Sequence, residues 1–226
     1  MRRIFIIIYC ILISLVGFAQ NDVTKFLGIP VDGSKSEMIR KLKAKGFTQN
    51  LIGGVEVLKG RFNGSDVNLH IITEKGKVAR VMVCDDNTFG ETDIKIRFNR
   101  LCQQFAENGK YIGVLDYTIP EDEDISYEIS VNDKRYEAVF YQLPNGKTLE
   151  QLQADILSQI RAKYTPEQLQ NLSDEAKTEL ISGTLETLID LVHNKPVWFM
   201  ISELSGKYYI SIFYDNEYNM AQGEDL

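Results

Sequence analysis

The sequence has few of the residues on which catalysis usually depends. Its only histidines are His70 and His193, although imidazole is the side chain most often used for proton transfer near neutral pH. It has no Gly-x-Ser-x-Gly elbow, no His-Glu-x-x-His helix, no phosphate-binding glycine loop and no dinucleotide-binding glycine pattern. These absences disfavour an enzyme, but they leave open a hydrolase with an unrecognised site, because catalytic triads assemble from distant positions.

Both histidines also have an ordinary structural explanation. His70 falls on the polar side of an expected strand, and His193 falls in the last turn of an expected long helix. An imidazolium at that end of a helix complements the negative end of the helix dipole. We therefore expect a surface role for His70 and a capping role for His193, and we assign no catalytic residue.

The chain lacks an excess of basic residues. It has 25 lysines and arginines against 32 aspartates and glutamates, which gives a formal net charge of -7. Such a surface repels phosphate backbones and anionic lipids. We therefore expect no nucleic-acid binding and no insertion of the mature chain into a membrane.

No apolar run reaches the roughly 20 residues that a transmembrane helix needs. The pronounced run at residues 4–16 follows two arginines and precedes Gly-Phe-Ala at residues 17–19, a small-x-small cleavage pattern. This order is typical of a secretory signal peptide. We predict that residues 1–19 are removed and that residues 20–226 are exported, to the periplasm or the cell exterior.

Few cysteines remain after that cleavage. Cys84 and Cys102 could form a bridge in an oxidising compartment, but Cys102 lies beside the apolar stripe of an expected helix, where a buried free thiol is the alternative. A chain of this length buries a core without metal or disulfide support, so we expect no cofactor. The acidic run 121–124 lacks the alternating ligands and glycine turn of a calcium loop, so we expect a surface loop and assign no metal.

Capping and turn signals divide the rest of the chain into helices and strands. Ser34 and Thr148 open capping boxes, Ser173 caps a further helix, and Asn-Gly and Lys-Gly turns join alternating segments. The expected helices cover residues 35–45 and 91–108, a segment that buries Leu149, Leu152, Ile156 and Ile160, and a segment with the apolar stripe Ile181, Leu185, Leu188 and Val192. The expected strands cover residues 55–62, 67–72, 78–84, 111–117, 125–131, 136–141, 197–202 and 207–214. The nearly continuous apolar content of residues 78–84 indicates burial on both faces.

These elements predict an α+β protein in which an antiparallel sheet carries helices on one face. Helices are followed by antiparallel strands three times, and residues 133–141 match residues 206–214 at four of nine positions. This likeness suggests tandem helix-plus-meander modules near residues 20–88, 89–145 and 146–226. The alternative is that aromatic hairpins resemble one another without any repeat.

One segment carries a family resemblance. Residues 26–34, Phe-Leu-Gly-Ile-Pro-Val-Asp-Gly-Ser, followed by Met38, Leu42, Gly46 and Phe47, resemble the opening of secreted α+β proteins of unknown function from Bacteroidetes. The resemblance implies a fold and brings no catalytic residues. More remotely, a short helix followed by an antiparallel meander is similar to the tandem modules of β-lactamase inhibitor proteins, a likeness of topology alone.

The final expected strand carries large side chains on both faces. Tyr208 and Tyr214 alternate onto one face and Tyr209 and Phe213 onto the other, with Trp198 on the neighbouring strand. Either the hairpin is covered on both sides, or one aromatic face is open for a partner. Because tyrosine and tryptophan suit contact surfaces, Trp198 and these three tyrosines are the candidate ligand-binding residues. We expect an exported, non-enzymatic binding or inhibitor-like module for a protein or glycan. A structural envelope protein without a ligand is a further alternative.

Overall fold

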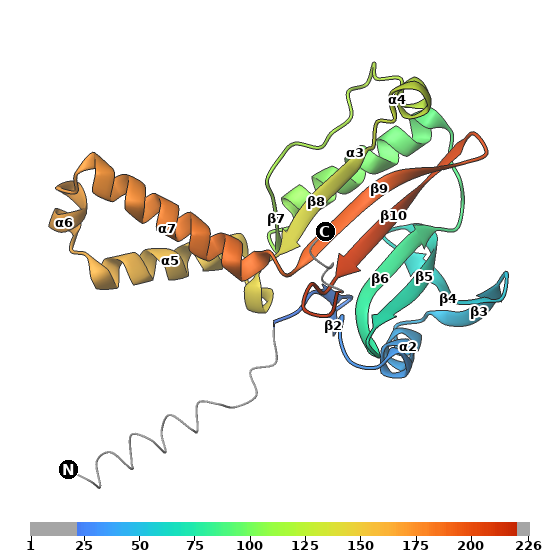
Figure 1. Cartoon of the computed structure of the whole chain (residues 1–226), viewed down its shortest axis with the longest axis horizontal. Coiled ribbons are helices and arrows are strands. Elements are labelled where there is room, and N and C mark those ends of the chain that lie inside the picture. The colour runs from blue at the N-terminus through green and yellow to red at the C-terminus, as the bar shows by residue number, and fades with distance from the viewer. Residues whose placement is uncertain (1–21, 221–226) are drawn as a thin grey trace, which may run out of the picture.

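The computed structural model describes residues 22–220 (Figure 1), so the predicted signal peptide lies outside the described residues. The helices of this part are α2 (Lys35–Ala44), α3 (Glu91–Glu107), α4 (Ile125–Asn132), α5 (Leu149–Lys163), α6 (Pro166–Gln170) and α7 (Asp174–Val192), with a 3-10 turn at Pro144–Gly146. The strands are β1 (Lys25–Phe26), β2 (Ile29–Pro30), β3 (Thr48–Ile52), β4 (Val55–Phe62), β5 (Ser65–Glu74), β6 (Lys77–Asp85), β7 (Tyr111–Gly113), β8 (Glu137–Gln142), β9 (Pro196–Leu204) and β10 (Lys207–Asp215).

Eight of these strands form one antiparallel sheet in the order β3-β4-β5-β6-β10-β9-β8-β7, and β1 pairs with β2 separately. The protein is therefore α+β with an antiparallel sheet, as the sequence predicts. The sheet has two halves of similar plan. In each half a helix, α2 or α3, precedes four strands, and the halves join where β6 pairs with β10.

The two expected module boundaries differ in where they lie relative to the sheet. The boundary near residue 88 lies between β6 and α3, where the first half of the sheet ends. The boundary near residue 145 lies between β8 and β9, which pair directly with Ala138 opposite Phe199. The second meander therefore crosses that boundary, and α5 to α7 form an insertion between two neighbouring strands.

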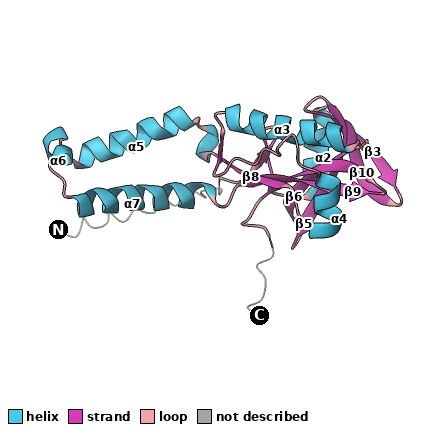
Figure 2. Ribbon diagram, turned by 90° about the horizontal axis from the view of Figure 1, so that it is seen from above, coloured by secondary structure: helices cyan, strands magenta, loops and turns pink. Residues whose placement is uncertain are grey.

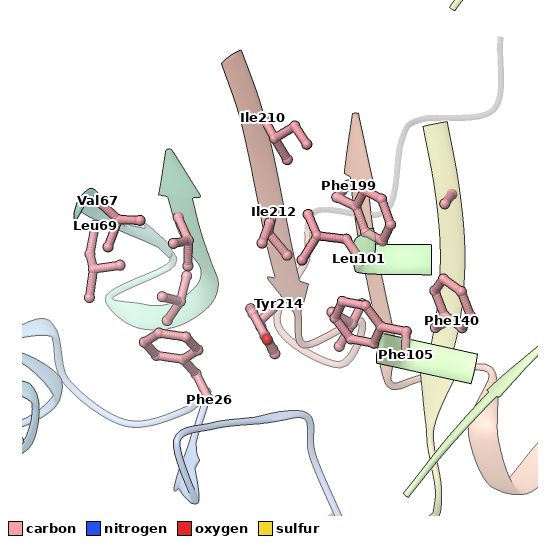
Figure 3. Packing of buried hydrophobic residues seen from close by; sticks show 14 of the residues in the cluster. Phe26, Val67, Leu69, Leu101, Phe105, Phe140, Phe199, Ile210, Ile212 and Tyr214 are labelled. Atoms are coloured by element: carbon pink, nitrogen blue, oxygen red, sulfur yellow. The ribbon is translucent and has the colours of Figure 1, made fainter. Parts of the chain in front are cut away.

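The core lies between one face of the sheet, the inner face, and helices α2 and α3. The predicted stripe of α3, namely Ile94, Phe98, Leu101 and Phe105, is buried. Its rings meet aromatic side chains of the sheet, with centroids 5.0 Å apart for Phe98 and Phe199 and for Phe105 and Phe140. Figure 3 shows Phe105 beside Phe140. Burying each such side chain contributes about 1.5–3 kcal/mol, so this layer fixes α3 on the sheet.

The prediction of a strand at residues 125–131 is wrong, because this segment forms helix α4. The Asp124 carboxylate accepts a hydrogen bond from the Tyr127 amide at 2.8 Å, which caps the helix start. Asp133, at φ 53°, ends it in the left-handed conformation. Burial of Ile125 in the core holds the helix in place. Strand β8 therefore pairs with β7 and β9 and not with residues 125–131.

The strand expected at residues 111–117 is shorter than predicted, since β7 ends at Gly113. The Asp116 carboxylate accepts hydrogen bonds from the amide and the hydroxyl of Thr118, at 2.9 and 2.8 Å. This local turn takes the chain away from the sheet. Strand β3 was not predicted, because all five of its residues are exposed at the sheet edge and show no buried alternation.

Helices α5 and α7 extend away from the sheet as an arm (Figures 1 and 2). Leu152 and Val192 are buried at its base together with Leu143. Further out, Ile181 and Leu185 of the predicted stripe are exposed. The expectation that these helices bury their apolar stripes on the sheet is therefore wrong beyond the base of the arm. Within residues 22–220, no helix combines the length and the apolar character that crossing a bilayer requires.

Candidate functional site

The candidate site lies on the outer face of the sheet, the face opposite the core. Strand register identifies this face, because residues that are cross-strand partners point to the same side. One row of partners crosses five strands and consists of His70, Met82, Phe213, Trp198 and Val139. Most of these side chains are half-buried, so this face carries large groups that water still reaches.

Four residues form a compact group on this face, the outer-face cluster: Arg80 of β6, Trp198 of β9, and Phe213 and Asp215 of β10. The rings of Trp198 and Phe213 stack with centroids 4.0 Å apart and an interplanar angle of 16°. The Arg80 guanidinium carbon lies 4.9 Å from the Phe213 centroid and 5.5 Å from the Trp198 centroid. These distances place the cation within range of both ring faces.

The carboxylate of Asp215 fixes this geometry. It accepts hydrogen bonds from Nε and Nη2 of Arg80, at 2.5 and 2.7 Å, and from Nε1 of Trp198 at 2.8 Å. Its side chain is only 3% exposed, against 22% for Arg80. Because the pair is bidentate, it holds the guanidinium plane in one orientation. The cluster therefore holds the Trp198 ring and the Arg80 side chain in fixed positions, and the charges of Arg80 and Asp215 compensate each other.

The structure does not bring the four predicted ligand-binding residues together. Trp198 and the half-buried Tyr209 lie on the outer face, whereas Tyr208 and Tyr214 point into the core, where both are buried. The Tyr208 hydroxyl bonds to the Ser126 hydroxyl at 2.9 Å and so links β10 to α4. Burial raises the pKa of Tyr214 well above its usual value, so its phenol is neutral. Both inner tyrosines have a packing role.

Sequence reasoning placed Phe213 on the same side as Tyr209 but missed Arg80 and Asp215. Because the apolar content of residues 78–84 predicts a strand buried on both faces, Arg80 was not considered as a surface residue. In the structure Val81 and Val83 face the core, while Arg80 and Met82 are half-buried on the outer face. An arginine inside an otherwise apolar strand was the available sign that one face of β6 is not part of the core.

Neither histidine is arranged for catalysis in the part of the chain that the structure describes. His70 lies in the outer-face row, and burial lowers its pKa. Nδ1 of His193 lies 3.2 Å from the carbonyl oxygen of Ile189, at the end of α7. Within residues 22–220 neither ring bonds to a carboxylate or hydroxyl. Two cavities beside α3, of about 810 and 890 Å³, have no histidine among their lining residues.

The cysteines and the acidic run have local structural roles. Cys84 and Cys102 are both free, because Cys84 lies on the outer face and Cys102 on α3 beneath the inner face. Glu123 accepts hydrogen bonds from Lys134 and from the Tyr136 hydroxyl, and these hydrogen bonds lower its pKa. In the described ranges, no three His, Cys, Asp or Glu side chains gather closely enough to hold a metal ion.

Compared with the histidines, the cysteines and the acidic run, the outer-face cluster is thus the group of residues best suited to contact another molecule. Phe213 is buried, so the parts of the cluster that solvent reaches are the Trp198 ring and the Arg80 side chain. These groups suit contact with apolar side chains or with the C–H face of a sugar. The carboxylate of the cluster, Asp215, is already paired with Arg80. Comparisons of the chain with protein-family models, with curated proteins and with solved structures find no match.

Proposed function

We propose that this chain is an exported, non-enzymatic binding module that holds its ligand on the outer face of the sheet. The observation that carries the proposal is the outer-face cluster, in which the chain's single tryptophan is stacked, hydrogen-bonded and half-exposed. Stacking on Phe213 and the hydrogen bond to Asp215 hold this tryptophan in a fixed orientation on the outer face.

Rigidity favours binding because a surface that is already ordered loses little side-chain entropy when a ligand docks. The bidentate contact between Arg80 and Asp215 supplies that order. Tryptophan and arginine are also the residues that most often dominate the energy of an interface. The cluster thus combines suitable residue types with a geometry that is set before binding.

A protein is the ligand that fits best. Met82 and Met200 flank the cluster on the outer face, and flexible thioethers adapt to apolar side chains of a partner. A glycan is the second candidate, because the stacked ring of Trp198 suits a sugar face. Nucleic acid and anionic lipid fit poorly, since the chain carries a net charge of -7.

The proposal is tested by comparing ligands retained by matched variants. The chain is produced in its own cells with a C-terminal tag, and proteins and glycans of the cell envelope that bind it are recovered. Trp198→Ala and Tyr209→Ala alter the outer face, whereas Leu51→Ser alters an exposed side chain of β3 on the opposite side of the sheet. We expect a ligand that binds the wild type and Leu51→Ser but is lost from both outer-face variants.

Two controls make the result decisive. Circular dichroism spectra must match the wild type, so that a lost ligand reflects the surface and not unfolding. The wild type is also incubated with a generic ester and peptide library, which tests the hydrolase alternative. Turnover of that library, together with no ligand that depends on Trp198, would overturn the binding proposal.

A further inference from the structure

A second surface, on the arm, is apolar and unpartnered in the described structure. Ile181, Leu185 and Ile189 of α7 follow one another at four-residue intervals and so lie along one side of the helix. Their exposed fractions are 68%, 54% and 51%. We call these three residues the α7 stripe. Single exposed apolar residues are common on proteins, but an aligned row on a projecting helix marks an interaction site.

The α7 stripe lies on nearly the same side of the helix as two residues that already have a partner. Leu188 and Val192 belong to the small cluster at the base of the arm, where they pack with Leu152 and Ile156 of α5. These contacts anchor the base of α7. They leave the three residues of the α7 stripe exposed, so this apolar side is only partly covered by α5.

An acidic ridge runs beside the stripe. Glu175, Glu179, Glu186 and Asp190 are spaced by four, seven and four residues, so they share one side of α7, and all four are exposed. That side lies about a third of a turn from the α7 stripe. The only cation on α7, Lys177, forms an ion pair with Asp174 at 3.3 Å. The ridge therefore keeps its negative charge.

We propose that the α7 stripe docks an amphipathic helix of a partner protein whose apolar face is flanked by lysines or arginines. The stripe spans about 12 Å, which matches roughly two to three turns of a docked helix. A partner that buries its apolar side chains on the stripe places one flank against the acidic ridge. Complementary charge at that flank selects the partner and its orientation.

The charge pattern also argues against other occupants. A second copy of the chain would bring an identical acidic helix to the stripe, and antiparallel helices related by a twofold axis meet along the same flank. The two ridges would then repel. A membrane surface rich in anionic lipid repels the same ridge. This inference does not rest on the outer-face cluster, which lies on the sheet and not on the arm.

The test uses the full chain and a displayed library of amphipathic helices. Each helix has leucines at a-type and d-type positions and flank positions randomised among lysine, glutamate and serine. We expect selection on the wild type to enrich lysine on one flank. We expect the selected helices to bind Leu185→Asp at least about ten-fold more weakly, and to bind Leu204→Asp, a change at another exposed leucine, as tightly as wild type.

A charge reversal provides the second arm of the test. In the double variant Glu179→Lys, Glu186→Lys, the preferred flank should change from lysine to glutamate. The proposal is overturned if no helix is enriched, if the flanks show no charge preference, or if Leu185→Asp binds as well as wild type. It is also overturned if light scattering shows a dimer that Leu185→Asp dissociates, or if vesicles of phosphatidylglycerol bind in place of the helices.

Discussion

Replacing Asp215 with alanine should destabilise the fold and loosen the outer-face cluster together. The change removes three hydrogen bonds, two from Arg80 and one from Trp198, and leaves the guanidinium without its carboxylate. Breaking a buried ion pair by removing one partner costs about 3–5 kcal/mol. The Arg80 side chain is 22% exposed, so water compensates part of that cost. We therefore expect the free energy of unfolding to fall by about 3 kcal/mol.

Urea unfolding followed by far-ultraviolet circular dichroism measures this effect. With a slope of about 3 kcal/mol/M, a loss of about 3 kcal/mol lowers the urea midpoint by about 1 M at unchanged slope. The matched control is Asp66→Ala, which removes a carboxylate from an ion pair with Arg61 in which both side chains are well exposed. Such pairs contribute about 0–1 kcal/mol, so the control should barely move the midpoint.

Fluorescence of the single tryptophan reports the second half of the same prediction. Trp198 is stacked on Phe213 and hydrogen-bonded to Asp215, so the variant should show red-shifted emission and stronger quenching by iodide under native conditions. The reasoning is refuted if Asp215→Ala has the same midpoint as Asp66→Ala, or if its native emission and quenching are those of the wild type. Either result would mean that the carboxylate does not hold the cluster.

Three further changes have outcomes that the structure specifies. Gly60→Ala places a Cβ 2.5 Å from Cδ1 of Phe47, so we expect about 1–3 kcal/mol of destabilisation, measured as a lower urea midpoint; an unchanged midpoint would show that the ring moves freely. Burial raises the pKa of the Cys102 thiol to about 12, so at pH 8 iodoacetamide should modify Cys102 in the native chain far more slowly than in the urea-unfolded chain, and equal rates would contradict this burial. Burial opposes ionisation of Asp22, but hydrogen bonds from Lys195 and from the amide of Asn145 lower its pKa below 3.8. Its stabilisation should therefore be present at neutral pH and decrease as pH falls below about 4, so the difference between the midpoints of wild type and Asp22→Asn should shrink as pH is lowered; a constant difference would refute the linkage.

Elements whose apolar residues recur at a regular spacing could be predicted from the sequence. Helix α3 is an example, because its apolar residues recur at helical spacing and are buried where the helix meets the core. Helix α4 shows how such signals fail. Residues 125–131 alternate apolar and polar side chains as a strand does, yet the Asp124 cap and the spacing of Ile125 and Ile129 suit a helix that packs on the core. The tertiary contact decided between two acceptable local patterns.

The candidate site could be predicted only in part for a related reason. Alternation along β10 places Tyr209 and Phe213 on one face, and this needs only the local sequence. The contact of Arg80 with Asp215 joins residues 135 positions apart, and no local pattern reports such a pair. The exposed stripe of α7 is a similar case, since an amphipathic helix has the same sequence whether its apolar side meets the core or stands free.

The position of β10 in the sheet has a consequence for how the molecule is made. Of the described strands it comes last along the chain, yet it occupies the middle of the sheet between β6 and β9. Synthesis proceeds from the N-terminus. Until residues 207–215 have been made, a nascent chain therefore cannot join the two halves of the sheet, and each half exposes an unpaired edge strand.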